Sequence, residues 1–255
     1  MAAIGTLLES RPALQALRRT LPKGAPRITA CRTPAALQRL LQNRLVDAIV
    51  LTPNPSLLGT IGELRRRLPG IPVIAYAAFR PDDGELLLAC LEREIAAIVV
   101  EGVDDAVAGE LVARHSATAV RKHLLSDAPR VLRLSEPLQQ AAWEVLLAEV
   151  EAPIRTGALA ARLGVSREHL SRQFGAGGAP NLKRVIDLTR IICAAQLLAN
   201  PGYALTDVVR LLHFATSSHL NATSRRIAGV TARELGAMTP RAILAAFVQG
   251  NTRSR

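Results

Sequence analysis

The sequence predicts an α/β N-terminal half followed by an all-helical C-terminal half. Short apolar, β-branched runs alternate with helical patterns over residues 1–125, and only helical periodicity follows. The chain has 255 residues, 49% of them apolar, which is enough for two domains with ordinary cores. Because strands and helices alternate, we expect a parallel sheet in the N-terminal half with helices on both faces.

Five strands and five helices are expected in this half. The strands are apolar runs of about seven residues, at 3–10, 26–32, 46–52, 71–77 and 96–102. The helices have apolar residues on one face, at 11–21, 33–45, 58–70, 81–94 and 103–125. Thr33 is the expected N-cap of the second helix, with Pro34 at its first position, and Pro69-Gly70 ends the third.

This order resembles the receiver domain of bacterial response regulators over roughly residues 3–125. Three segments carry the resemblance. LLESRPAL resembles the end of the first strand and its loop, VDAIVLTPNP the third strand and its loop, and IPVIAYAA the fourth strand. The resemblance implies a flavodoxin-like, five-stranded parallel sheet. It also suggests a homodimer, because receiver domains commonly pair through the last helices and strands of the sheet.

The chemistry of a receiver is missing at the matching positions. Glu9 and Ser10 stand where receivers use two acids to hold magnesium, and Thr52 stands where the phosphorylated aspartate would be. Ala77 falls near the switch hydroxyl, and Glu101 replaces the lysine that would contact the phosphoryl group. An acyl phosphate needs a carboxylate nucleophile, and magnesium needs a cluster of oxygen ligands. We therefore expect a pseudo-receiver that has no phosphoacceptor and no metal site, or a flavodoxin-like scaffold with no inherited signal.

Charge is distributed unevenly along the chain. Residues 1–125 hold 16 basic and 12 acidic side chains, whereas residues 155–255 hold 14 basic and 4 acidic ones. With a net charge of +11, the chain is expected to bind a polyanion, and the excess charge lies in the C-terminal half. We expect a linker at 126–136, a helical domain at 137–245 and a basic tail at 246–255. The first helix of that domain should begin at Pro137 and bury a stripe of Leu138, Ala142, Val145 and Leu146.

A first helix-turn-helix pattern is TGALAARLGVSREHLSRQF. Gly164 can adopt the left-handed conformation that ends a helix, Val165 fills the turn, and Ser166 is a good N-cap for the second helix. Leu170 and Phe174 then point inward and leave a polar, basic outer face. An ordinary helical hairpin with a solvated face is the alternative. The candidate DNA contacts are Ser166, Arg167, His169, Ser171 and Arg172.

A second unit, ALTDVVRLLHFATSSHLNATSRRIAG, follows a long helix over residues 179–200 that we expect to be buried. Phe214 fills its turn as Val165 does, but the spacing from Phe214 to Leu220 is one residue longer, so this turn is wider. Its candidate DNA contacts are Thr216, Ser217, Ser218, His219, Asn221, Arg225 and Arg226.

Two such units joined by a long helix and followed by GVTARELG resemble the AraC/XylS family of bacterial transcription regulators over roughly residues 135–240. Arg190 in the linking helix also matches that family, whose DNA-binding domain the resemblance implies. Gln173, Val209, His213 and Ala232 depart from the family pattern, and three of these lie in or after the second unit. His213, where glycine is usual, is expected to be a packed or capping residue rather than a ligand.

Other classes of function find no support in the sequence. Cys31, Cys90 and Cys193 lie far apart, with no zinc-ligand spacing, and are expected to be buried thiols in a reducing cytoplasm. Phosphate-binding loops, metalloprotease motifs and hydrolase motifs do not occur, so no enzyme activity and no cofactor are expected. We expect a soluble, cytoplasmic protein, because we find no signal peptide and no apolar stretch of about 20 residues.

The leading hypothesis is a sequence-specific DNA-binding transcription regulator that is not controlled by aspartyl phosphorylation. One alternative is a protein-interaction adaptor with degenerate helix-turn-helix units. Another is a ligand-gated regulator that senses an unidentified small molecule at the carboxyl edge of the sheet. The expected partners are double-stranded DNA, with a second copy of the chain and RNA polymerase as further candidates, and no membrane.

Overall fold

The computed structural model describes residues 2–149 and 154–252, which form two compact units. The first covers residues 1–120 and the second residues 121–255. The division falls inside helix α6 (Ala117–Leu124), five residues before the expected end of the N-terminal domain at 125. Each unit is described by itself below.

The N-terminal unit contains one five-stranded parallel sheet. Its strands are β1 (Ala3–Leu7), β2 (Arg27–Ala30), β3 (Val46–Leu51), β4 (Val73–Ala77) and β5 (Ala97–Val100). All pairs are parallel and the order across the sheet is β2-β1-β3-β4-β5, which is the flavodoxin-like order. The predicted fold class and all five predicted strands are confirmed.

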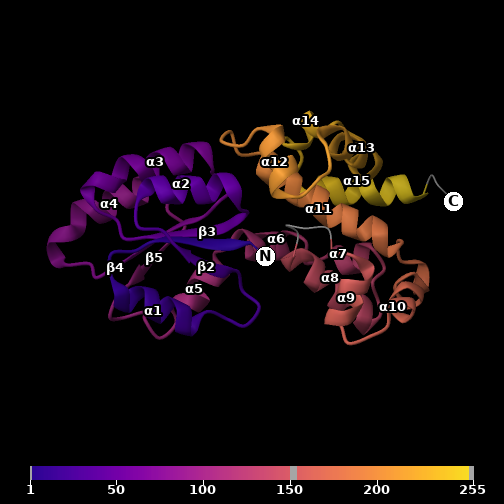
Figure 1. Ribbon diagram of the computed structural model, residues 1–255, viewed down its shortest axis with the longest axis horizontal. Helices are drawn as coiled ribbons and strands as arrows, with labels where there is room; N and C mark the ends of the chain where they lie inside the picture. Colours follow the sequence, from indigo (N-terminus) through magenta and orange to yellow (C-terminus); the bar gives the residue numbers. More distant parts are fainter. Residues whose placement is uncertain (1, 150–153, 253–255) are drawn as a thin grey trace. The chain divides into compact units, whose positions relative to one another are not determined.

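Helices cover both faces of this sheet, with α2, α3 and α4 on one face and α1 and α5 on the other (Figure 1). These helices are α1 (Arg11–Thr20), α2 (Pro34–Asn43), α3 (Leu58–Arg67), α4 (Gly84–Glu92) and α5 (Ala108–Arg114). Short 3₁₀ turns, η1 (Pro55–Leu57) and η2 (Pro81–Asp83), precede α3 and α4. Thr33 caps α2 as predicted, because its side chain accepts a hydrogen bond from the Ala36 N–H at 3.2 Å.

The core beneath α1 and α5 is mainly aliphatic. Alternate residues of the strands meet apolar residues of the two helices, and the buried set is Ile4, Ala13, Leu17, Ala48, Val50, Ile74, Tyr76, Val99, Ala108 and Val112. Ala108 and Val112 belong to the apolar stripe of the last predicted helix. That stripe is therefore largely occupied by its own sheet.

The single helix predicted over residues 103–125 is wrong: the structure has a turn followed by α5 and α6. The Ser116 side chain caps the new start by accepting a hydrogen bond from Ala119 N–H at 3.1 Å. The buried carboxylate of Asp47 accepts two more, from the backbone and hydroxyl of Thr118, both at 2.9 Å. A continuous helix would use the Thr118 N–H internally and leave this buried carboxylate without it.

The C-terminal unit is entirely helical among its described residues. Its helices are α7 (Ala128–Val131), α8 (Pro137–Ala148), α9 (Thr156–Arg162), α10 (Arg167–Phe174), α11 (Leu182–Leu198), α12 (Leu205–Leu211), α13 (Ser217–Ala228), α14 (Ala232–Leu235) and α15 (Pro240–Thr252), with a 3₁₀ turn η3 (Ala176–Gly178). The expected linker at 126–136 contains α7 and buries Leu132 and Leu134. The expected tail is helical as far as Thr252; residues 253–255, like Val150 at the end of the first predicted helix, lie outside the described residues.

Two predictions about this unit's core have different outcomes. Helix α11 is buried on nearly every face, so its predicted core role is confirmed. The stripe predicted on α8 is rotated: Leu138 and Val145 are half-buried, whereas Gln139, Trp143 and Leu147 are buried. The three cysteines are buried free thiols, as expected. Among the described helices, none is long and apolar enough to cross a membrane.

Candidate nucleic-acid interface

The first helix-turn-helix consists of α9, a tight turn and α10. Gly164 has φ +67°, and two backbone hydrogen bonds close the turn, from Val165 N to Ala160 O at 3.0 Å and from Gly164 N to Ala161 O at 3.3 Å. This pair of bonds is the Schellman motif, which satisfies carbonyls at the end of α9. Ser166 then caps α10, as predicted, by accepting a hydrogen bond from His169 N–H at 3.1 Å.

A buried glutamine, which the sequence patterns did not reveal, holds the far end of α10. The Gln139 side chain is fully buried on α8, and its amide nitrogen lies 3.2, 2.9 and 3.2 Å from the carbonyl oxygens of Gln173, Phe174 and Ala176. The first two carbonyls belong to the last turn of α10, where no helical partner remains, and the third belongs to the first residue of η3. Gln139 thus fixes the C-terminal end of α10, the second helix of the first helix-turn-helix.

The second helix-turn-helix, α12 and α13, closes its turn by the same two bonds. Phe214 N donates to Val209 O at 2.9 Å and His213 N donates to Arg210 O at 3.2 Å. His213, with φ +51°, takes the place of Gly164. The extra residue predicted here is Ala215, which lies before the N-cap Thr216; that cap accepts from His219 N–H at 3.0 Å.

His213 acts through its backbone. Its side chain is exposed, so of the two predicted roles, packing or capping, the structure has the second, with His213 ending α12. Histidine tolerates the left-handed region better than most residues with a Cβ. The departure from glycine therefore leaves the geometry of the turn intact.

Arg190 of α11 supports this second turn. It is buried, and its Nη2 donates to Leu212 O at 2.8 Å and to His213 O at 3.5 Å, at the negative end of α12. Its guanidinium stacks 3.9 Å from the centre of the Phe214 ring, and that ring meets His219 edge-on at 5.5 Å. Burial lowers the pKa of Arg190, while the nearby Asp187 carboxylate opposes that shift.

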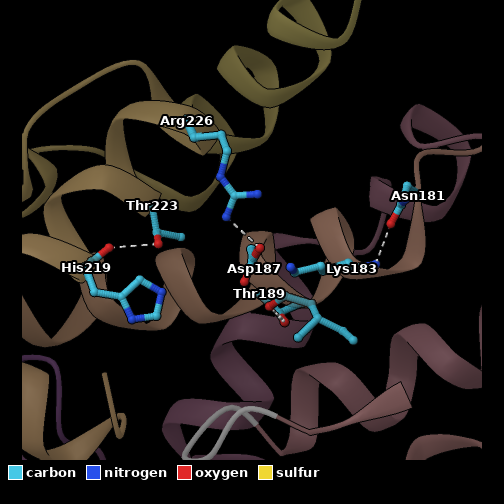
Figure 2. Close-up of polar contacts among 8 residues, drawn as sticks. Asn181, Lys183, Asp187, Thr189, His219, Thr223 and Arg226 are labelled. Carbon is cyan, nitrogen blue, oxygen red and sulfur yellow. Dashed lines mark hydrogen bonds and ion pairs between the residues drawn. The ribbon is translucent and has the colours of Figure 1, made fainter. Parts of the chain in front are cut away.

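Asp187 also ties α13, the second helix of the second helix-turn-helix, to α11. Figure 2 shows its carboxylate facing Arg226 of α13, with Arg226 Nη2 and Asp187 Oδ2 2.7 Å apart. In the same view the Thr223 hydroxyl donates to the His219 carbonyl at 2.8 Å, inside α13. Together Asp187 and Arg190, one turn apart on α11, hold both helices of the second unit.

The candidate DNA-contact residues fall into two groups in the structure. Most are exposed or half-exposed on the first turns or outer faces of α10 and α13: Ser166, Arg167, His169, Ser171, Arg172, Thr216, Ser217, Ser218, His219 and Arg225. Asn221 and Arg226 are engaged within the fold. The Asn221 side-chain oxygen accepts from Ala232 N–H at 3.0 Å, and Arg226 pairs with Asp187.

Near the start of α11, Lys183 is exposed, while the Arg184 guanidinium stacks 5.0 Å from the Phe247 ring of α15.

The motif GVTARELG, which follows α13, contains α14 and leads towards α15. Thr231 and Glu234 cap α14 reciprocally, and these hydrogen bonds lower the pKa of Glu234. A Cβ on Gly236 would lie 2.8 Å from the Leu198 carbonyl oxygen, so this close approach to α11 requires glycine.

In the N-terminal unit, the carboxyl edge of the sheet is closed by its own hydrogen bonds. Ser10 donates to the Glu101 carboxylate, and Asn54 Nδ2 donates to Glu9 Oε1 at 2.8 Å. The Thr52 hydroxyl donates to Tyr76 O at 3.2 Å and accepts from Glu9 N–H at 3.3 Å. The residues at the positions of receiver chemistry, Glu9, Ser10, Thr52 and Glu101, therefore lie together at this edge. There their polar groups form hydrogen bonds with one another.

Tyr76 is the buried neighbour of this edge, and sequence reasoning did not single it out. Its hydroxyl donates to Asp105 Oδ1 at 2.7 Å. Burial, followed by that hydrogen bond, raises the pKa of Tyr76 well above its ordinary range. Among the described residues, no group of three or more His, Cys, Asp or Glu side chains is placed to hold a metal ion.

Of the comparisons with known proteins, the match to a family model identifies a domain in the C-terminal unit. No curated protein sequence matches the chain. A solved structure of full-length FixJ from B. japonicum is similar, with 11% identity over 93% of this chain and 98% of that chain, but its TM-score of 0.38 supports no conclusion. The family model described as "Helix-turn-helix domain" matches residues 159–238, from within α9 to the segment between α14 and α15. Residues 159–238 therefore form a helix-turn-helix domain.

Proposed function

We propose that this chain is a sequence-specific DNA-binding transcription regulator that reads DNA through both α10 and α13. The observation that carries the proposal is the repeated turn: both units close by the same hydrogen bonds and present a capped, polar second helix. Each of these helices begins with exposed hydroxyl-bearing residues, and arginines follow on the outer face. Such side chains can contact phosphates and base edges in the major groove.

A single helix, α11, links the two helix-turn-helix motifs and packs against α12, α13 and α8. Because it is buried along its length, we propose that it holds both recognition helices on one face of the duplex. Successive major-groove segments on one face are about 34 Å apart. One chain would then cover two adjacent segments.

The nature of the exposed surface favours DNA over a protein-adaptor role. The large hydrophobic side chains that are exposed among the described residues are Leu88, Leu91, Val103, Val107 and Val120, all in the N-terminal unit. Protein interfaces usually centre on buried apolar or aromatic anchors, whereas phosphate contacts need cations. The outer faces of α10 and α13 provide cations and hydrogen-bonding groups.

The experiment compares the affinity of single variants for cognate and random duplexes at two salt concentrations. We expect Arg167→Ala and Arg172→Ala to reduce discrimination by about 1–3 kcal/mol, because arginine can bind guanine O6 and N7 bidentately. Arg225→Ala should chiefly lower affinity for both duplexes and flatten the salt slope by about one unit.

The matched control is Arg130→Ala, since Arg130 is exposed in the same unit but lies on α7, outside both helix-turn-helix units. It should leave the specificity ratio and the salt slope unchanged. If Arg167→Ala and Arg172→Ala retain the wild-type ratio, α10 is not the reader.

We further propose that the N-terminal unit is a receiver-like domain without aspartyl phosphorylation. The support is that Thr52 occupies the acceptor position and that Glu9, Ser10 and Glu101 are engaged in hydrogen bonds at this edge. Incubation with a small phosphodonor and magnesium should give no phosphate incorporation by intact mass. A stable, stoichiometric acyl phosphate would overturn this proposal.

Homodimerisation through the N-terminal unit is part of the same proposal. Four of the five exposed large hydrophobic residues lie on α4 and in the segment between β5 and α5, next to the edge strand β5; the fifth, Val120, lies on α6. Light scattering at micromolar concentration should give the mass of a dimer, and Leu88→Ser combined with Leu91→Ser should shift it towards the monomer. A monomer mass for the wild type would refute this part.

A further inference from the structure

The N-terminal unit has a strongly one-sided charge that its receiver-like chemistry does not use. Residues 11–46 contain eight basic and no acidic side chains. The rest of the unit, residues 1–10 and 47–120, contains six basic and twelve acidic ones. The basic run is therefore not part of a general excess in this unit, because the remainder of the unit is acidic.

The fold gathers the basic run around one edge of the sheet. It spans α1, β2 and α2, and β2 is an edge strand that pairs only with β1. Because α1 and α2 lie on opposite faces of the sheet (Figure 1), the three elements together enclose the β2 edge. We call this the α1–β2–α2 surface; its cations are Arg11, Arg18, Arg19, Lys23, Arg27, Arg32, Arg39 and Arg44.

All eight cations are exposed, and none forms a side-chain hydrogen bond or ion pair within the part of the chain that the structure describes. The helix dipole accounts for Arg18 and Arg19, which lie in the last turn of α1. It does not account for Lys23 in the loop or Arg27 at the start of β2. Exposed cations that lack partners within the fold favour the approach of an anion.

The composition of the surface indicates which anion. The exposed large hydrophobic residues of the unit all lie outside residues 11–46, so the surface lacks the apolar anchor that a protein partner or a bilayer would engage. Seven of the eight cations are arginines, whose planar fork matches phosphate oxygens. Eight charges spread over three elements fit an extended polyanion better than a small one.

We propose that the α1–β2–α2 surface binds the phosphate backbone of duplex DNA outside the segment contacted by α10 and α13. This inference rests on the proposed DNA-binding function, because a chain held on DNA brings the surface to a high local concentration of phosphates. The contact is independent of base sequence. It adds affinity and salt dependence without adding discrimination.

The test measures the salt dependence of binding by the full chain to a long random-sequence duplex. The variant Arg18→Gln/Arg27→Gln removes two cations of the surface. Each phosphate contact contributes about 0.9 to the slope of log affinity against log salt, so the slope should fall by up to about 1.8 units. The ratio of cognate to random affinity should stay unchanged.

The matched control is Arg66→Gln/Arg114→Gln, which removes the same charge from exposed arginines at the ends of α3 and α5. Its slope should equal that of the wild type. If both double variants have the same salt slope, the proposed role of the α1–β2–α2 surface is wrong, while the helix-turn-helix proposal is unaffected. The discrimination of Arg167→Ala tests only the helix-turn-helix proposal. If sedimentation without DNA shows a salt-sensitive oligomer that Arg18→Gln/Arg27→Gln dissolves, the surface binds another copy of the chain and the proposal is wrong.

Discussion

The two helix-turn-helix turns offer a paired test of backbone strain, because they use one geometry with different residues. Gly164 and His213 both end a helix in the left-handed region, with φ of +67° and +51°. A Cβ added to Gly164 would meet no atom within 4 Å, so Gly164→Ala changes backbone strain without a steric clash. The left-handed conformation costs a residue with a Cβ about 1–2 kcal/mol. A smaller unfolded-state entropy of alanine offsets part of this, so we expect a net loss of about 1 kcal/mol.

The reciprocal change is His213→Gly, which removes the strain and increases the entropy of the unfolded chain. We expect a net gain of less than about 1 kcal/mol. Urea unfolding followed by tryptophan fluorescence measures both effects. Trp143 is the only tryptophan of the chain and is buried in α8, so its signal reports on the C-terminal unit alone. This matters because a two-unit chain need not unfold in one transition.

The control is His213→Ala, which removes the exposed imidazole but keeps a Cβ in the left-handed region. It should change the unfolding free energy by less than the His213→Gly variant and in the destabilising direction. Should Gly164→Ala leave the unfolding free energy unchanged, or His213→Gly lower it by more than 1 kcal/mol, the backbone account of these turns would be wrong.

Three further perturbations test the contacts that hold the helix-turn-helix domain. Gln139→Leu should lower the unfolding free energy by about 1–3 kcal/mol in the same fluorescence assay, because the carbonyls at the end of α10 lose a buried donor; an unchanged value would refute that role. Arg190→Leu should cost about 1.5–3 kcal/mol, and Arg190→Lys should not restore it, because lysine lacks the planar group stacked on Phe214. The folded state lowers the pKa of Glu234 below its ordinary value of 4.5, so its contribution is present above pH 4.5 and is lost as the pH falls through the folded pKa. Glu234→Gln should therefore lose less stability than the wild type between pH 5 and pH 3, and an identical acid dependence would contradict this.

The sequence predicted most of the fold because the local signals agree with one another. The five strands are short apolar runs, and caps such as Thr33 and Ser166 occur where helices begin. The break between α5 and α6 could not be predicted in this way. It depends on Asp47, a residue of β3 distant in the sequence, whose buried carboxylate accepts hydrogen bonds from Thr118.

The candidate interface was predictable in outline for the same reason, and its supports were not. The exposed outer faces of α10 and α13 follow from helical periodicity. Gln139 and Asp187, in contrast, are polar residues that are buried in otherwise apolar helices, and helical periodicity assigns them no role. A polar residue among apolar ones in a core helix is the available signal, since burial requires that it have a partner. This signal points to both Gln139 and Asp187. The engagement of Asn221 and Arg226 within the fold, in contrast, follows only from their partners Ala232 and Asp187 in the structure.

The second helix-turn-helix departs from the family pattern at Val209 and His213, yet its turn has the same geometry as the first. His213 supplies the left-handed residue that glycine would supply, and Arg190 binds the carbonyl oxygens at the end of α12. In the first unit, Gln139 similarly binds carbonyl oxygens at the end of α10. Each unit is thus held by a buried polar side chain from a neighbouring helix that binds backbone carbonyls. The turn of the second helix-turn-helix therefore forms without glycine at position 213. The difference between the two units therefore lies in their outer faces, and Arg172 and Arg225 are the side chains through which DNA binding should distinguish them.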